Sequence, residues 1–205
     1  MISWSTYLFF TGACLALVLI PGPNHFYIAA RGLAQGRAAA LASAFGVETG
    51  TLVHIAAAAA GLSYLITKSA TLFGIVKWAG VAYLVYLGVR ALTSKDEAGG
   101  TALRPQPLPR VFLEGVLVNV LNPKVTLFFL ALLPQFVDAD AGSPALQIVV
   151  LGVTLLALGL LSDIVYAFTA GALGTRLARR ARTLRYVSGV VYLGLGVVTA
   201  FTGRR

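Results

Sequence analysis

The chain has 205 residues, of which 58% are hydrophobic and only 11% are charged, and its formal net charge is +9. A soluble domain averages about 25% charged residues, so this composition excludes an ordinary soluble globular protein. The positive charge does not indicate nucleic-acid binding, because the bases lie mainly in polar segments between apolar stretches, as they do in membrane proteins.

Apolar windows predict an all-α polytopic membrane protein. A helix needs roughly 20 apolar residues to cross a bilayer. Allowing an occasional charge, we expect six transmembrane helices, at about residues 6–30, 38–66, 71–92, 112–136, 145–173 and 186–202. The first is not typical of a secretory signal, because it lacks a basic beginning and its apolar stretch runs directly into Pro21.

The first expected span is interrupted in its middle by four residues that disfavour a continuous helix: Pro21, Gly22, Pro23 and Asn24. A proline inside a helix donates no hydrogen bond and clashes with the carbonyl four residues earlier, so Pro21 frees the carbonyl of Leu17. A free carbonyl facing lipid costs several kcal/mol, so such a break is tolerated only inside the protein or beside a water-filled cavity.

The fourth expected span contains a second break, carried by Asn119, Asn122, Pro123 and Lys124. Here Pro123 frees the carbonyl of Asn119. A half-helix that restarts at a break offers free N–H groups and the positive end of its dipole, which attract a carboxylate, whereas the freed carbonyls attract an ammonium. Matched breaks in two halves of a chain indicate a transport site. A packing kink without a ligand is the alternative.

A polar segment at 93–110, rich in glycine, proline and charge, is typical of a linker and divides the chain into halves of three spans. The sequence AGVAYLVYLG, which begins at Ala79, is similar to SGVVYLGLGV, which begins at Ser188. Because three is an odd number, a second copy would cross the membrane in the opposite sense. We therefore predict a single transporter domain of two inverted repeats, at about 6–92 and 112–202, with chance similarity as the alternative.

The distribution of bases predicts the orientation. Eleven of the sixteen lysines and arginines lie in the loops after the first, third and fifth spans, and four lie on the other side. Basic loops stay in the cytoplasm, so these three loops are expected inside and both termini outside.

Three charged residues are expected deep in the membrane. Glu48 and Asp163 lie about 17–20 Å from the cytoplasmic loops, and Lys124 lies at a similar depth. Such charges are costly and mark functional pathways. Two acids and one base leave a negative charge unmatched, so either an acid is protonated or a cation binds there. Asp163 is favoured as the proton carrier and Glu48 as the partner of the substrate or of Lys124. A pair that only locks helices together is the alternative.

The two histidines, a pair of glycines and the single cysteine give weaker indications of their roles. His25 and His54 could join a proton relay, although His54 is favoured as a polar contact between helices. Gly46 and Gly50 form a GxxxG pattern that lets two helices approach closely. Cys14 is the only cysteine and is expected to be a small buried hydrophobe. No metal signature, catalytic motif or cofactor motif is present in the sequence.

Several of these stretches together resemble the lysine exporter / homoserine–threonine resistance (LysE/RhtB) family: PGPN, GVETG, FLEGVLVNVLNPK and the aspartate of the fifth span. The similarity covers nearly the whole chain. It implies a bacterial inner-membrane protein that exports amino acids or close derivatives, driven by the proton motive force. By matching motifs it implies a site at Pro21, Gly22, Pro23, Asn24, Glu48, Asn119, Asn122, Pro123, Lys124 and Asp163.

We therefore predict a secondary transporter that exchanges an amino acid for protons across the lipid bilayer, without a cofactor, metal or nucleic-acid partner. Efflux of metal ions or of another small solute is the alternative transport function, although ligands for a metal are scarce. A membrane-embedded enzyme and a scaffold that transports nothing are the remaining classes. The sequence leaves the exported side chain, the coupling stoichiometry and the existence of a homo-oligomer open.

Overall fold

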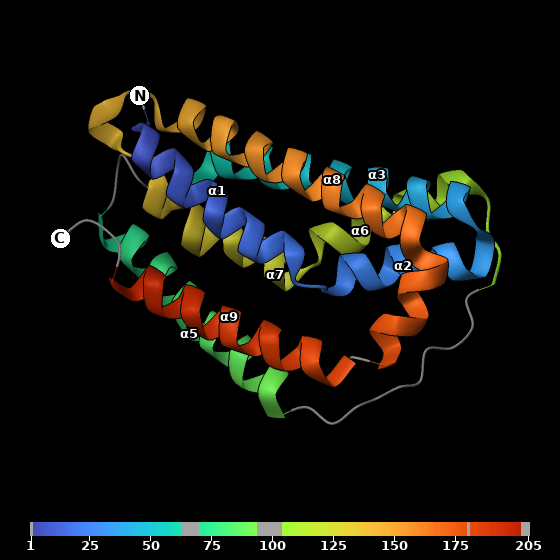
Figure 1. Ribbon diagram of the computed structural model, residues 1–205. Helices are drawn as coiled ribbons and strands as arrows, with labels where there is room; N and C mark the ends of the chain where they lie inside the picture. The colour runs from blue at the N-terminus through green and yellow to red at the C-terminus, as the bar shows by residue number, and fades with distance from the viewer. Residues whose placement is uncertain (1, 63–69, 94–103, 180, 202–205) are drawn as a thin grey trace.

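The computed structural model describes residues 2–62, 70–93, 104–179 and 181–201 (Figure 1). These residues form helices and contain no β-strand, which confirms the predicted all-α class. Most of the predicted linker, residues 94–103, lies outside the described residues.

The first half of the chain begins with a broken helix. Helix α1 spans Trp4–Leu19 and helix α2 spans Pro23–Gln35, and the two are bent by 44° at the break. Helix α3 spans Arg37–Ala57 and continues as the π-helix η1 over Ala58–Leu62. Helix α5 spans Ala70–Thr93. The predicted break in the first span is therefore confirmed.

The second half begins in the same way. Helix α6 spans Leu108–Val120 and the short helix α7 spans Pro123–Leu127. The chain then continues as the π-helix η2 over Phe128–Leu132 and the 3₁₀-helix η3 over Leu133–Phe136. The bend at this break is 45°, so the second predicted break is also confirmed.

Two further helices close the chain. After the 3₁₀-turn η4 at Ala139–Ala141, helix α8 spans Pro144–Arg179 and helix α9 spans Ala181–Phe201. Helix α8 extends beyond the end expected from sequence, residue 173. Among the described helices, two are long and apolar enough to cross a membrane, or up to four if each bent pair is one span.

The outer surface of the bundle is apolar. Large hydrophobic side chains such as Phe9, Leu19, Leu161 and Phe201 are more than half exposed, and they lie on helices from both ends of the chain. Exposed apolar surface of this extent marks contact with a membrane rather than with water. The chain is therefore a membrane protein.

Helices α3 and α6 pack closely because glycines line their contact. A Cβ added at Gly46 would collide with the carbonyl oxygen of Phe112, and one added at Gly115 would lie 2.7 Å from the carbonyl oxygen of Ser43. Gly50, on the same face of α3, would place a Cβ 2.7 Å from the Cβ of Asn119. The GxxxG pattern therefore has the helix-packing role that the sequence predicts.

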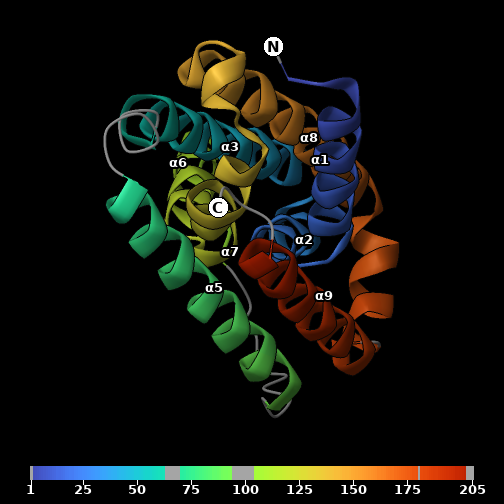
Figure 2. The same cartoon turned by 90° about the vertical axis from the view of Figure 1, so that its left-hand side faces the viewer.

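Helices α5 and α9 form a second close pair beside the bundle of α1, α2, α3, α6 and α8 (Figure 2). A Cβ added at Gly88 would lie 2.6 Å from Leu193 Cγ, and one added at Gly189 would lie 2.7 Å from Leu92 Cγ. The contact is reciprocal: Gly189 lies 101 positions after Gly88, and Leu193 lies 101 positions after Leu92. This register matches Gly189 with Gly88, whereas the sequence comparison matches it with Gly80.

A cluster of phenylalanines fills the space between α1 and the end of the second broken helix. We call Phe10, Phe128, Phe129 and Phe136 the aromatic cluster. The ring of Phe10 lies 5.7 Å from that of Phe128 and 5.1 Å from that of Phe136. Cys14, one turn after Phe10, is fully buried in the same core, as predicted.

Candidate functional site

The break between α1 and α2 leaves carbonyls that a lysine from the other half of the chain binds. The Nζ of Lys124 donates to the carbonyl oxygen of Leu17 at 2.7 Å and to that of Ile20 at 2.8 Å. The Leu17 carbonyl is the one that Pro21 frees. The freed carbonyls therefore attract an ammonium, as predicted, and in this structure the ammonium belongs to Lys124.

The two breaks face each other through their asparagines. Asn122 is the N-cap of α7, and its Oδ1 accepts from the backbone N–H of Lys124 at 3.0 Å. Its Nδ2 donates to Oδ1 of Asn24, in the first break, at 2.7 Å. Both side chains are buried. Asn122 thus ends one broken helix and joins it to the other.

The two deep acids reach the same place from two helices. Glu48 of α3 is 8% exposed and Asp163 of α8 is 2% exposed, and both line the same cavity. Gly159, one turn before Asp163, makes room for this approach, because a Cβ there would lie 2.5 Å from Glu48 Oε1. Neither acid forms an ion pair with Lys124 within 4 Å.

These groups line one buried cavity of about 50 Å³. Seven of the ten residues expected from sequence contribute to its wall: Gly22, Asn24, Glu48, Asn119, Asn122, Lys124 and Asp163. The three prolines form the breaks and do not line the cavity. Pockets that hold small molecules measure about 300–1,000 Å³, so the cavity is closed to an amino acid in this conformation.

Three buried oxygens at the cavity have no hydrogen-bond partner among the described residues: Glu48 Oε2, Asn119 Oδ1 and Asp163 Oδ2. All three are acceptors. The amide nitrogen of Asn119 does have a partner, because it donates to Thr51 Oγ1 at 3.3 Å. A buried polar atom without a partner costs about 1–3 kcal/mol, so the cavity is built to receive hydrogen-bond donors.

Thr51, Gly159 and Ser162 were not expected at the site from the sequence, and His25 was named there only as a possible member of a proton relay. His25 lines the cavity, and its Nε2 lies 3.6 Å from Asp163 Oδ1. Two of them could have been found from their distance to Asp163 in the sequence, since Ser162 precedes it directly and Gly159 lies one helical turn before it. Among the described residues, no group of three His, Cys, Asp or Glu side chains is placed to hold a metal ion.

His54 lies beside the site without lining the cavity. Its Nε2 is 3.3 Å from the carbonyl oxygen of Asn119, and its ring stacks on Phe129 at 5.5 Å between centroids. The Asn119 carbonyl is the one freed by Pro123. The prediction that His54 makes a polar contact between helices is therefore confirmed.

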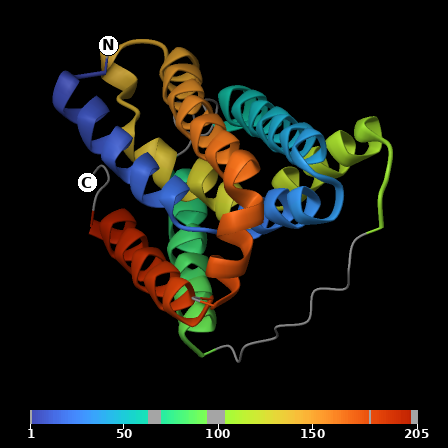
Figure 3. The ribbon, with the colours of Figure 1, turned by 45° about the vertical axis from the view of Figure 1, so that its right-hand side comes forward.

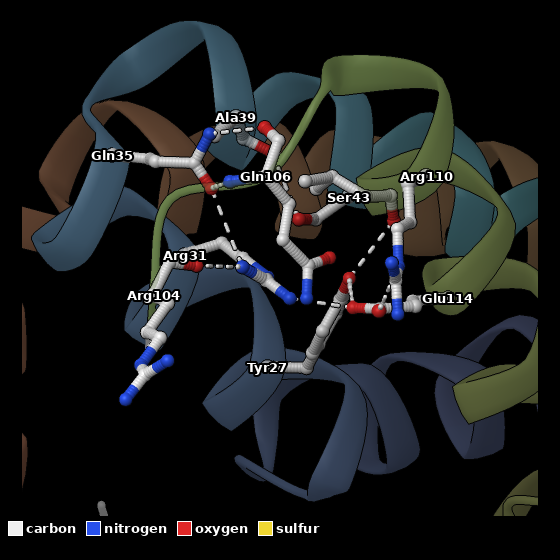
Figure 4. A network of polar contacts seen from close by, with 10 residues as sticks. Tyr27, Arg31, Gln35, Ala39, Ser43, Arg104, Gln106, Arg110 and Glu114 are labelled. Atoms are coloured by element: carbon white, nitrogen blue, oxygen red, sulfur yellow. Dashed lines mark hydrogen bonds and ion pairs between the residues drawn. The ribbon is translucent and has the colours of Figure 1, made fainter. Parts of the chain in front are cut away.

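A polar network closes the space between α2 and α6, as Figure 4 shows. We call Tyr27, Arg31, Gln35, Gln106 and Glu114 the polar latch. Arg31 donates to Glu114 Oε2 at 2.5 Å, to Gln35 Oε1 at 3.3 Å and to the carbonyl of Arg104 at 3.1 Å. Tyr27 donates to the carbonyl oxygen of Val111 at 2.8 Å.

The polar latch also holds the segment that leads into α6. Gln35 accepts from the backbone N–H of Gln106 at 3.0 Å and donates to its carbonyl at 2.6 Å. The first span was expected to end at about residue 30, which places Arg31 in the loop after it; this is wrong, because Arg31 lies inside α2 and is only 2% exposed. The reason is that α2 continues to Gln35, which keeps Arg31 within the helix and in reach of Glu114.

The chain is similar to bacterial membrane proteins over nearly its whole length. Residues 15–203 match the family model described as LysE type translocator. The chain is 31% identical to the leucine efflux protein of Klebsiella pneumoniae, over 73% of this chain and 71% of that protein. It is 30% identical to the homoserine/homoserine lactone efflux protein of Salmonella typhimurium, over 90% of each. It is 29% identical to the membrane protein YrhP of Bacillus subtilis, over 91% of this chain and 94% of that protein. No solved structure matches the chain.

Proposed function

The chain belongs to the LysE type translocator family, and we propose that it exports amino acids or close derivatives from the bacterial cytoplasm in exchange for protons. Two relatives are named for efflux of leucine and of homoserine or its lactone. Leucine, homoserine and homoserine lactone all carry an α-ammonium group. The proposed substrate class is therefore defined by that group, and the side chain is left open.

The observation that carries this proposal is the set of three unpartnered acceptor oxygens at the cavity, on Glu48, Asn119 and Asp163. An α-ammonium has three N–H donors and one positive charge. It would give each oxygen a donor and would balance the charge that two carboxylates leave unmatched beside one lysine.

Lys124 is suited to bind the other end of an amino acid. Its ammonium has three donors, and two of them are used by the carbonyls of Leu17 and Ile20. The third can donate to a substrate carboxylate. Leu17, Val18, Val125 and Leu155 supply an apolar wall to the same cavity, against which an aliphatic side chain can pack.

Exchange for protons follows from competition for the same carboxyl oxygens. With Glu48 and Asp163 both ionised, the cavity carries one excess negative charge, which either a substrate ammonium or a proton can balance. The two therefore exclude each other, which is the condition for antiport. We assign the coupling role to Asp163, because it is more buried than Glu48 and less able to rely on water when charged, so that a proton held on its carboxylate or on a donor that faces it neutralises the excess charge.

The proposed architecture is a single domain of six spans in two inverted repeats. Its support is the equivalence of the N-caps Gly22 and Asn122, each followed by a proline, and the reciprocal contact of α5 with α9. An even number of spans also agrees with Figure 1, in which α1 begins and α9 ends at the same end of the molecule. In the orientation expected from the basic loops, that end is periplasmic and the polar latch lies on the cytoplasmic side.

The test is transport by the purified chain in proteoliposomes with an imposed pH gradient. We expect uphill movement of L-leucine, L-homoserine or homoserine lactone. For the substrate that moves fastest, the analogue that lacks the α-ammonium should not move; for leucine this is 4-methylpentanoate. Glu48→Gln should abolish uphill transport, whereas Glu97→Gln, in the predicted linker, serves as the matched control. Transport of a metal ion instead of any of these compounds, or equal transport of 4-methylpentanoate and leucine, would contradict the proposal.

A further inference from the structure

His25 is the third residue of α2 and is 6% exposed, directly beside the first break. The backbone N–H of Gly22 donates to its Nδ1 at 3.3 Å. An imidazole nitrogen that accepts a hydrogen bond carries no proton, so the ring is neutral and its proton is on Nε2. The hydrogen bond thus defines the tautomer of His25.

The other side of the ring completes a connection across the break. His25 Nε2 lies 3.3 Å from Ser162 Oγ, and Ser162 Oγ donates to the carbonyl oxygen of Val18 at 3.3 Å. In a continuous helix the N–H of Gly22 would donate directly to the carbonyl of Val18, four residues earlier. His25 and Ser162 therefore stand between the donor and the acceptor of a helical hydrogen bond that the break removes. Figure 3 shows α8, which carries Ser162, passing beside the junction of α1 and α2.

Charged and titratable groups surround this histidine on three helices. On α8, Asp163 Oδ1 lies 3.6 Å from His25 Nε2, and the ring of Tyr166 lies 4.3 Å from the imidazole, between centroids. Lys124 of α7 and Glu48 of α3 line the same cavity as His25. With both acids ionised, these groups have one negative charge in excess, which an imidazolium would balance.

We propose that His25 is the positioning residue through which proton binding acts on the first helix break. A proton that enters the cavity adds to the Nδ1 lone pair and gives an imidazolium, whose Nε2–H then faces the Asp163 carboxylate. The N–H of Gly22 loses its acceptor in the same step, since Nδ1 has become a donor. The connection between α1 and α2 opens, and loss of that proton restores it. This inference rests on the proposed exchange for protons and adds the structural element that the proton moves.

The chain offers a direct test because His25 and His54 are its only histidines. The full chain, labelled with ¹⁵N at histidine and glycine, is reconstituted in bilayers and studied by NMR as the pH is lowered. Two imidazoles are expected, and His54→Gln assigns them. We expect His25 to be in the Nε2–H form at high pH, and its protonation to shift the amide signal of Gly22. A His25 found in the Nδ1–H form, or protonation that leaves the Gly22 amide unchanged, would overturn the proposal.

A transport measurement separates coupling from simple packing. His25→Gln keeps an acceptor that can reach back to the Gly22 N–H, as glutamine does at this position of a capping box, but it cannot take up a proton. In proteoliposomes, the rate of leucine–leucine exchange by this variant should no longer depend on pH. The matched control, His54→Gln, should keep the pH profile of the unmodified chain. A wild-type pH profile for His25→Gln would overturn the proposal.

The two readouts also distinguish this inference from the proposed function. If the unmodified chain moves no amino acid, the proposed function fails, while the NMR experiment still decides whether protonation of His25 releases Gly22. If the chain transports leucine and His25 shows the wrong tautomer, only the inference about His25 fails.

Discussion

The two ends of the paired broken helices are held together by different kinds of contact, polar at one end and aromatic at the other. Beyond the breaks on one side, α2 meets α6 through the polar latch, in which Arg31 is bonded to Glu114 and Gln35. On the other side, α1 meets η2 and η3 through the aromatic cluster around Phe10. The cavity lies between them, lined by residues of both breaks.

The difference indicates how each end can open. The groups of the polar latch can exchange their hydrogen bonds for bonds to water, so separation there costs about 0.5–1.5 kcal/mol for each bond. The aromatic cluster has no such exchange, because opening it exposes apolar surface at about 25 cal/mol per Å². We therefore expect the polar latch to be the end that opens first, and in the proposed orientation it faces the cytoplasm, where an exporter loads its substrate.

The largest loss of stability is expected when a ring of the aromatic cluster is removed. Phe10→Ala removes a fully buried ring that contacts both Phe128 and Phe136, and it should lower the free energy of unfolding by about 3–5 kcal/mol. The matched control is Phe9→Ala, because Phe9 is the adjacent residue and is 76% exposed. Thermal unfolding of both variants in the same bilayer checks the expectation, and equal losses would contradict it.

A substitution in the polar latch should lower the free energy of unfolding by less, and it should leave Cys14 protected. Arg31→Met removes the hydrogen bonds to Glu114, Gln35 and the Arg104 carbonyl, with an expected cost of about 1–3 kcal/mol. The single cysteine, Cys14, is buried in the core beside Phe10 and reports on the other end. Maleimide labelling of Cys14 should therefore rise in Phe10→Ala and stay low in Arg31→Met. Faster labelling in Arg31→Met would show that the two ends do not open separately.

The smallest loss of stability is expected when only a charge in or beside the polar latch is removed. Glu114→Gln keeps an acceptor for Arg31 and Tyr27 but removes the negative charge, so we expect a loss of about 0.5–1.5 kcal/mol that shrinks at high salt. Arg110→Ala removes only an exposed partner of Glu114, one helical turn away, and should cost no more than about 0.5 kcal/mol. Unfolding at two salt concentrations measures both. A larger loss for Arg110→Ala would mean that the polar latch is centred on Arg110 instead of Arg31.

The parts of this structure that follow local rules were predictable from sequence. Proline at Pro21 and Pro123 must interrupt a helix, and the glycines of GVETG permit close packing, so the breaks and the contact of α3 with α6 were expected. The common depth of Glu48 and Asp163 followed from counting helical rise. The matching positions of the two breaks in the two halves predicted a site at these residues.

The parts that depend on tertiary contacts were not predictable. Lys124 donates to the carbonyls of the other break, and it forms no ion pair within 4 Å with an acid among the described residues. Arg31 has the sequence context of a loop residue, and only the position of Glu114 on a separate helix explains its burial. The role inferred for His25 depends on Ser162, which is 137 residues away in the chain.

Proton release on substrate binding would show whether the substrate ammonium and a proton share one site. The purified chain in weakly buffered detergent, near neutral pH, is mixed with the amino acid that it transports fastest, and a pH indicator records the protons released. If a substrate ammonium and a proton compete for the carboxyl oxygens of Glu48 and Asp163, binding should release protons, and Asp163→Asn should abolish the release. Binding of the same amino acid without any release of protons would contradict the account.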